Sequence, residues 1–220
     1  MVFDTGSGNN KRIINISQKA KELGQAECSA LMSLHALTGC DTTSSFKGIG
    51  KVKPLKVFKK FPKFTESLCS IGDSWEMQYK YVEDIEQFIC CLYGFQRFKK
   101  IDELRYHIVQ TKCSNKGALD VSKNIDLANL PPCSSTLLQH IKRTNYQVKI
   151  WKDAHINFHE TPEPTSHGWK IGELSLEPLW SDDTIIPVEL VDILEDITEY
   201  ESEEEDGYES DSSNSSDSVG

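Results

Sequence analysis

The chain has 220 residues, of which 38% are hydrophobic and 26% are charged, and its formal net charge is −10. The acidic charge is uneven: 15 of the 34 acids and none of the 24 basic residues fall in residues 182–220, so residues 1–181 keep 19 acids against 24 bases. No apolar run approaches the roughly 20 residues that span a bilayer, and seven scattered cysteines without C-x-x-C spacing favour neither a zinc site nor a disulfide framework. We therefore expect an intracellular, mildly basic domain followed by an acidic tail.

The first 24 residues predict a strand, a turn, a second strand and a short helix. Gly and Asn in "GSGNN" tolerate the backbone angles of a tight turn between "VFDT" and "KRIINI". Ser17 is the expected N-cap of the helix and Gly24 its C-cap. The Asp-Thr-Gly sequence at Asp4 has the spelling of an aspartic protease loop, but that enzyme needs two such loops that share one proton. Because the chain has one copy and helices follow it, Asp4 is interpreted as a turn residue.

Helical patterns predominate in residues 25–130. They are "QAECSALMSLHALTG", the lysine-rich amphipathic segment "KVKPLKVFKKF", "MQYKYVEDIEQFICCLYGF" and "IDELRYHIVQTK". The segment 34–61 combines the end of the first helix, a glycine-containing turn and the lysine-rich helix. We predict a helix-turn-helix element there.

Residues 131–181 predict a C-terminal helix and a hairpin. The helix is "SSTLLQHIKRTNYQVKIWKDA", with Ser134 as its expected cap after two prolines. Its basic side chains Lys142, Arg143 and Lys149 either extend a basic surface or form a solvated helix face. The alternation in "GWKIGELSLEPLW" predicts a small hairpin that contains tryptophan.

Residues 182–220 form the predicted acidic tail. "PVELVDILEDITEY" has the pattern of a short helix, and we expect disorder from about residue 199, where like charges leave too little apolar surface to bury. Ser202 precedes three glutamates and is a predicted phosphorylation site for an acidophilic kinase. The predicted fold class is mostly α with a small N-terminal β-hairpin and a C-terminal hairpin (α+β).

The segment "LHALTGCDTTSSFKGIGKVKPLKVFKKF" carries the functional prediction. Gly48 and Gly50 let the backbone approach a ligand closely, and the amides at the start of the next helix suit a phosphate. Val52, Leu55 and Phe58 predict an apolar stripe that leaves the lysines outward. The predicted DNA-backbone contacts are Lys47, Gly48, Ile49, Gly50, Lys51, Lys53, Lys56, Lys59 and Lys60, with Lys63 in the same acid-free run. The alternative is an amphipathic helix whose lysines only keep it solvated.

These residues also carry a resemblance. "GCDTTSSFKGIGK" resembles the Gly-x-Asp and Gly-Ile-Gly signature of flap endonucleases and the wider PIN-like nuclease superfamily. The resemblance implies a partial PIN/5′-nuclease-like domain, with residues 1–24 as a remnant of the nuclease core. It also implies that Gly-Ile-Gly grips the DNA backbone and that Asp41 joins acids that hold Mg²⁺ or Mn²⁺. "LHALTGCDTTSSFKGIGK", "LPPCSSTLLQHIKRTNYQ" and "GWKIGELSLEPLW" together resemble a group of uncharacterised transposon-associated animal proteins.

Three functions follow as expectations. In the resembling family most metal-binding acids lie upstream of the hairpin, and Asp41 alone cannot hold two hard cations. The first expectation is therefore sequence-independent DNA binding by a truncated, transposon-derived nuclear protein that is not an active enzyme alone. The second is a Mg²⁺- or Mn²⁺-dependent, structure-specific nuclease completed by upstream or partner acids. The third is a protein-interaction module whose acidic tail recruits a basic partner.

Overall fold

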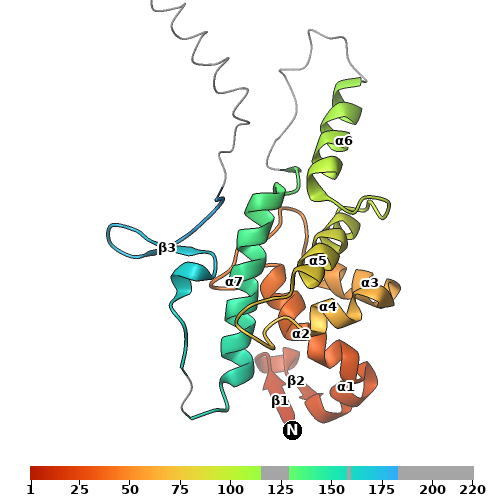
Figure 1. Cartoon of the computed structure of the whole chain (residues 1–220). Helices are drawn as coiled ribbons and strands as arrows, with labels where there is room; N and C mark the ends of the chain where they lie inside the picture. Colours follow the sequence, from red (N-terminus) through yellow and green to blue (C-terminus); the bar gives the residue numbers. More distant parts are fainter. Residues whose placement is uncertain (115–128, 158–159, 183–220) are drawn as a thin grey trace, which may run out of the picture. The chain divides into compact units, whose positions relative to one another are not determined.

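The computed structural model describes residues 1–114, 129–157 and 160–182. Within these ranges the chain forms seven α-helices and two separate antiparallel strand pairs, one near each end (Figure 1). The predicted mostly helical α+β class with two hairpins is therefore confirmed. The predicted helix and disorder of the acidic tail, together with Ser202, lie outside the described residues.

The first hairpin pairs β1 (Val2–Thr5) with β2 (Arg12–Asn15) through the short turn η1 (Gly8–Asn10). Asp4, the aspartate of the Asp-Thr-Gly sequence, forms a 2.9 Å ion pair with Lys11 and is half-exposed. Asp4 therefore lies in the first strand of the predicted hairpin and not in its turn.

Helix α1 (Ile16–Leu23) begins two residues earlier than a cap at Ser17 predicts. The side chain of Asn15 accepts a hydrogen bond from the Gln18 amide, so the prediction of Ser17 as N-cap is wrong. Ser17 instead accepts a hydrogen bond from the N-terminal amine. Gly24 ends the helix with a φ of 82°, a conformation that glycine adopts without strain.

The remaining elements include five helices at the predicted patterns and the predicted second hairpin, together with the short helix of residues 65–69, which the sequence did not predict. They are α2 (Gln25–Leu37), α3 (Val52–Lys60), η2 (Pro62–Phe64), α4 (Thr65–Cys69), α5 (Tyr79–Leu92), α6 (Ile101–Ser114), α7 (Ser134–Asp153), η4 (Pro164–Ser166), β3 (Trp169–Ile171) and β4 (Leu176–Pro178). Helix α2 lies between α7 on one side and α3 and α4 on the other (Figure 1).

The hydrophobic core gathers around α5. Ile85, Phe88, Ile89 and Leu92 recur at the spacing of one helical face, and all four are completely buried. Phe88 meets Phe64 edge-on at 5.5 Å, the arrangement that aromatic rings prefer. Burying each such side chain contributes about 2 kcal/mol, so this face fixes α5 against the short helices that follow α3.

Helix α7 is bound to the rest of the domain largely through buried polar side chains. Asn145 is the clearest case: its carbonyl oxygen accepts from the Gly72 amide at 2.7 Å, and its amide donates to the carbonyls of Ser74 and Trp75. One side chain thus satisfies three backbone groups of the irregular segment between α4 and α5. Gly72 has a φ of 79°, and a Cβ there would lie 2.7 Å from the amide of Lys149 on α7, so only glycine allows this approach.

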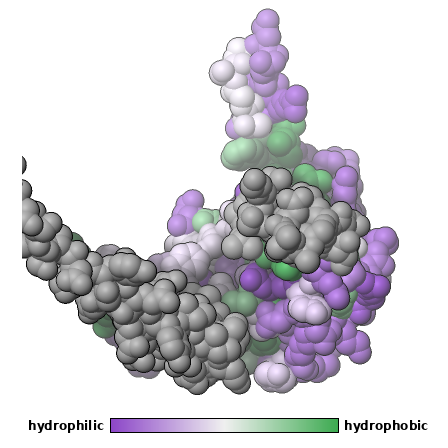
Figure 2. Space-filling model, turned by 90° about the horizontal axis from the view of Figure 1, so that it is seen from above, coloured by the Kyte–Doolittle hydropathy of each residue, from purple (hydrophilic) through white to green (hydrophobic). Residues whose placement is uncertain are grey.

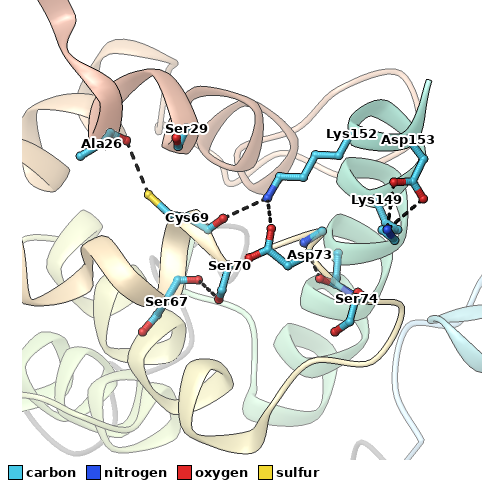
Figure 3. A network of polar contacts seen from close by, with 12 residues as sticks. Ala26, Ser29, Ser67, Cys69, Ser70, Asp73, Ser74, Lys149, Lys152 and Asp153 are labelled. Atoms are coloured by element: carbon cyan, nitrogen blue, oxygen red, sulfur yellow. Dashed lines mark hydrogen bonds and ion pairs between the residues drawn. The ribbon is translucent and has the colours of Figure 1, made fainter. Parts of the chain in front are cut away.

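Farther along α7, a charged side chain also binds the end of α4 and the segment that follows it (Figure 3). Lys152 donates to the Cys69 carbonyl at 3.0 Å and to the Asp73 carboxylate at 2.7 Å, and Lys149 pairs with Asp153 at 2.9 Å. At the other end, α7 begins at Ser134 and its cap residue is Cys133, so the predicted capping by Ser134 is wrong.

Candidate nucleic-acid interface

The loop between α2 and α3 folds back on the end of α2. The Thr43 hydroxyl donates to the Ala36 carbonyl at 2.6 Å and accepts from the Cys40 amide at 3.1 Å. Gly39 has a φ of 102°, and a Cβ there would lie 2.7 Å from the Cβ of Ser45. The glycine of the Gly-x-Asp sequence is therefore required by the close packing of the loop.

The Gly-Ile-Gly turn is anchored by its central residue. Ile49 is 7% exposed and belongs to the core, whereas Gly48 and Gly50 are exposed. Gly48 has a φ of 77°, but Gly50 has no left-handed φ, and a Cβ on either would meet nothing within 4 Å. The turn thus exposes the backbone of Gly48 and Gly50 to solvent, and the buried side chain of Ile49 anchors it in the core.

Helix α3 buries one face and exposes the other. Pro54 and Phe58 are buried and Leu55 is half-buried, but Val52 is 67% exposed, so the predicted stripe is wrong at its first position. Pro54, two residues later, takes the inward place at the start of the helix. A proline is tolerated there because the amides of the first turn have no partner within the helix.

The lysines of this region fall into groups with different environments. Lys53 and Lys56 are exposed, and within the described part of the chain their side chains have no hydrogen bond or ion pair. Lys59 pairs with Glu27 of α2 at 2.8 Å. The ammonium groups of Lys60 and Lys63 lie over the rings of Phe61 and Phe64, at 5.3 Å and 4.6 Å from the ring centroids.

Lys51 has a structural position that its sequence context did not indicate. Its ammonium donates to the His35 carbonyl at 2.7 Å, to the Gly39 carbonyl and to the Thr38 hydroxyl at 3.3 Å. These groups lie at the C-terminal end of α2, where a positive charge also interacts favourably with the helix dipole. Burial lowers the pKa of Lys51. The ammonium is therefore engaged by the protein, although it stands directly after the glycine turn.

Asp41 is exposed at the bend of the same loop. Its neighbour Thr42 donates to the side chain of Gln147 on α7 at 2.7 Å, which holds the bend against the body. In the described ranges, no group of three or more His, Cys, Asp or Glu side chains is placed to hold a metal ion. Asp41 therefore belongs to no such group among the described residues, and the predicted Mg²⁺ or Mn²⁺ stays a prediction.

The suggestion that Arg143 extends a basic surface is wrong. Arg143 is 1% exposed, and Lys149 is largely buried in its pair with Asp153. Helix α7 is covered around most of its circumference, and its buried polar or charged residues are Gln139, His140, Arg143, Thr144, Asn145 and Asp153. Elsewhere, the face seen in Figure 2 is mainly hydrophilic, with hydrophobic side chains in small patches between the polar ones.

Comparisons of the chain with models of protein families, with curated proteins and with solved structures found no match. The relationship to PIN-like nucleases and transposon-associated proteins therefore stays a prediction. Among the described residues, no helix combines the length and the apolar character needed to cross a membrane.

Proposed function

We propose that the Gly-Ile-Gly turn and the exposed face of α3 bind the phosphate backbone of DNA without regard to base sequence. The observation that carries the proposal is the division of α3: Pro54 and Phe58 fix one face in the core, and Lys53 and Lys56 project from the other without partners in the described structure. A lysine face held by a rigid, buried anchor positions point charges for phosphates.

The surrounding charge supports the same function. Residues 47–63 contain seven lysines and no acid. Within the same run, Gly48 and Gly50 leave room for a phosphate beside the backbone. A Cβ atom built on either glycine would meet no other atom within 4 Å. Lysine contacts of this kind release counterions and make binding depend on salt instead of sequence.

The direct test measures fluorescence anisotropy of labelled linear and branched DNA with the full chain at several salt concentrations. The variant is Lys53→Glu/Lys56→Glu, which breaks no intramolecular pair seen in the described structure. Its matched control is Lys21→Glu/Lys99→Glu, which changes the net charge equally at two exposed lysines on other elements. Lys51 is unsuitable as a probe because its ammonium caps α2.

The expected result is a loss of affinity in the α3 variant alone. If both lysines contact phosphates, the slope of log K against log salt should become shallower by about 1.8, at about 0.9 per phosphate. Equal losses in the variant and the control would reduce the effect to net charge. Salt-independent binding, or none at low salt, would contradict the proposal.

Gly50→Ala tests the turn separately. Glycine is not required there by φ or by space within the fold, so the variant should unfold like the wild type. Weaker DNA binding by this variant would then report the close approach of a phosphate to the turn. Unchanged binding would confine the contact to the lysines.

The alternative nuclease function is tested in the same samples with Mg²⁺ or Mn²⁺. Asp41 is the exposed carboxylate on the loop that would contribute a ligand. Metal-dependent cleavage lost in Asp41→Asn would favour a nuclease completed by acids from elsewhere. Recruitment of a basic partner by the acidic tail concerns residues outside the described ranges, and a chain that ends at residue 198 tests it by the loss of that partner.

A further inference from the structure

Arg143 on α7 holds a buried guanidinium that the protein only partly satisfies. Its Nη1 donates to the carbonyls of Gly168 at 2.8 Å and Leu179 at 2.5 Å. Its Nε and Nη2 are buried and have no hydrogen-bond partner among the described residues. These two nitrogens lie side by side on the planar group and form the fork that binds two oxygens of one oxyanion. A buried charged donor without a partner is a place where a water, an ion or a ligand can complete the hydrogen bonding.

Arg143 lines a cavity of about 500 Å³. The cavity lies between the loop that leads into the glycine turn, the end of α5, one face of α6 and of α7, the segment before α7, and Trp180 beyond the second hairpin. Lys47 and Arg105 also line it, and its lining contains no Asp or Glu. Ser44 and Thr136 add hydroxyl groups. Its volume falls in the range of sites for small organic ligands, and its charge is that of an anion site.

The other part of the lining is aromatic. Phe46, Tyr93 and Trp180 contribute rings to the cavity. Trp180 is 54% exposed, although a large apolar side chain is usually covered, and its ring centroid lies 5.4 Å from the guanidinium carbon of Arg143. A planar ligand ring can therefore stack on an aromatic wall while an attached oxyanion reaches the arginine.

We propose that this cavity binds a nucleoside monophosphate or a molecule of the same chemistry, with its planar ring against Trp180 and Tyr93. Its phosphate reaches the buried Nε and Nη2 of Arg143 when the side chains that cover them shift. Three basic side chains and several hydroxyls suit a dianion with three acceptor oxygens better than a carboxylate, which has one charge and two oxygens. Among the predicted DNA contacts, only Lys47 lines the cavity. The proposal therefore does not depend on the lysine face of α3.

The close approach of the second hairpin fixes the orientation of this arginine. Gly168 has a φ of 86°, and a Cβ there would lie 2.5 Å from the Gln139 carbonyl and 2.9 Å from the Cγ of Arg143. The glycine lets its own carbonyl reach Nη1, which fixes the plane of the guanidinium. With the plane fixed, Nε and Nη2 are oriented before any ligand arrives, and this reduces the entropic cost of binding.

The test uses the full chain with adenosine 5′-monophosphate as the probe. Binding is measured by titration calorimetry and by tryptophan fluorescence. Adenosine, inorganic phosphate and benzoate are the comparison ligands. The expected order is adenosine 5′-monophosphate first, with each comparison ligand roughly tenfold or more weaker, because each lacks the phosphate, the ring system or the third oxygen. Equal binding of adenosine would overturn the role of Arg143, and equal binding of inorganic phosphate would overturn that of the aromatic wall.

Two variants locate the ligand. Arg143→Lys keeps a positive charge but loses the fork, and Trp180→Ala removes a partly exposed ring whose loss the fold should tolerate. Each should weaken nucleotide binding roughly tenfold, whereas Lys99→Gln should not change it. If Arg143→Lys fails to fold, Trp180→Ala decides alone. Unchanged affinity in Trp180→Ala, or no binding of the nucleotide at millimolar concentration, overturns the proposal.

The two proposals fail independently. Lys53→Glu/Lys56→Glu should lose DNA and keep the nucleotide, because neither lysine lines the cavity. A competition experiment distinguishes the end of a DNA strand from a small molecule as the source of the bound phosphate. In it, oligonucleotides with and without a terminal phosphate compete with the free nucleotide for the cavity. Displacement by the phosphorylated oligonucleotide alone would assign the cavity to a strand end, and displacement by neither would assign it to the free nucleotide.

Discussion

The pH dependence of stability should report the burial of His140. Its side chain is 4% exposed, its Nε2 donates to the Leu37 carbonyl at 2.8 Å, and its ring meets Phe46 edge-on at 5.1 Å. Burial lowers the pKa of His140 to about 4, from an ordinary value of 6.5; the contact with Leu37 opposes this shift and the charge of Arg143 adds to it. The folded protein thus keeps the imidazole neutral.

The size and sign of the effect follow from these two values. As the pH falls below 6.5, the unfolded chain binds a proton that the folded chain refuses until about pH 4, so stability is complete above this window and decreases through it. The full difference corresponds to about 3 kcal/mol, at about 1.4 kcal/mol per pKa unit. About 2 kcal/mol of this should be lost between pH 7 and pH 5.

Urea unfolding followed by circular dichroism at pH 5, 6 and 7 measures this loss. His140→Gln keeps a donor for the Leu37 carbonyl but cannot titrate, so its free energy of unfolding should vary less with pH by about 2 kcal/mol. His155→Gln, which changes an exposed histidine of the same region, should follow the wild type. His167, whose pKa is also lowered by burial, accounts for part of the dependence that remains. Parallel pH profiles for His140→Gln and the wild type would refute the reasoning.

Three further predictions concern the fold. Asn145→Ala should lower the free energy of unfolding by about 3 kcal/mol, because it leaves the Gly72 amide and two carbonyls without partners; unfolding in urea checks this, and a loss below 1 kcal/mol would contradict it. Lys51→Gln should cost about 1 kcal/mol by weakening the end of α2, measured in the same way against Lys53→Gln, which should cost nothing. Cys90 should resist iodoacetamide in the native protein while Cys28 reacts, because Cys90 is fully buried and burial raises its pKa to about 12. Mass spectrometry of peptides compares the two rates of alkylation, and equal rates would contradict the burial of Cys90.

The helices were predictable because their apolar spacing is regular. On α5, Ile85, Phe88, Ile89 and Leu92 recur at i, i+3, i+4 and i+7, and the structure buries all four. Both hairpins followed from glycine-containing turns between alternating segments. The caps were less predictable: Asn15 and not Ser17 caps α1, since two neighbouring polar residues suit that role equally by type and only the backbone angle selects one.

The candidate sites depended on information that is not local in the sequence. The six lysines that follow Gly-Ile-Gly in residues 51–63 cannot be told apart by composition. Lys51 nevertheless reaches back to α2 and Lys59 pairs with Glu27, whereas Lys53 and Lys56 face solvent. Which lysine is engaged depends on the path of the loop from Gly39 to Gly50. That path is set by long-range packing of Phe46 and Ile49 into the core.

Arg143 shows the same limit from the opposite direction. A basic residue in a helix with a polar composition predicts a solvated position, because burying an unpaired charge is costly. Helix α7 departs from that expectation by placing His140, Arg143 and Asn145 against three different segments that offer backbone carbonyls. These segments are the end of α2, the second hairpin with its flanks, and the irregular stretch between α4 and α5. His140 and Asn145 are satisfied by those segments, but Arg143 keeps two donors without partners in the described structure. The contrast on one helix singles out the arginine as the position where a ligand, and not the chain, would complete the hydrogen bonding.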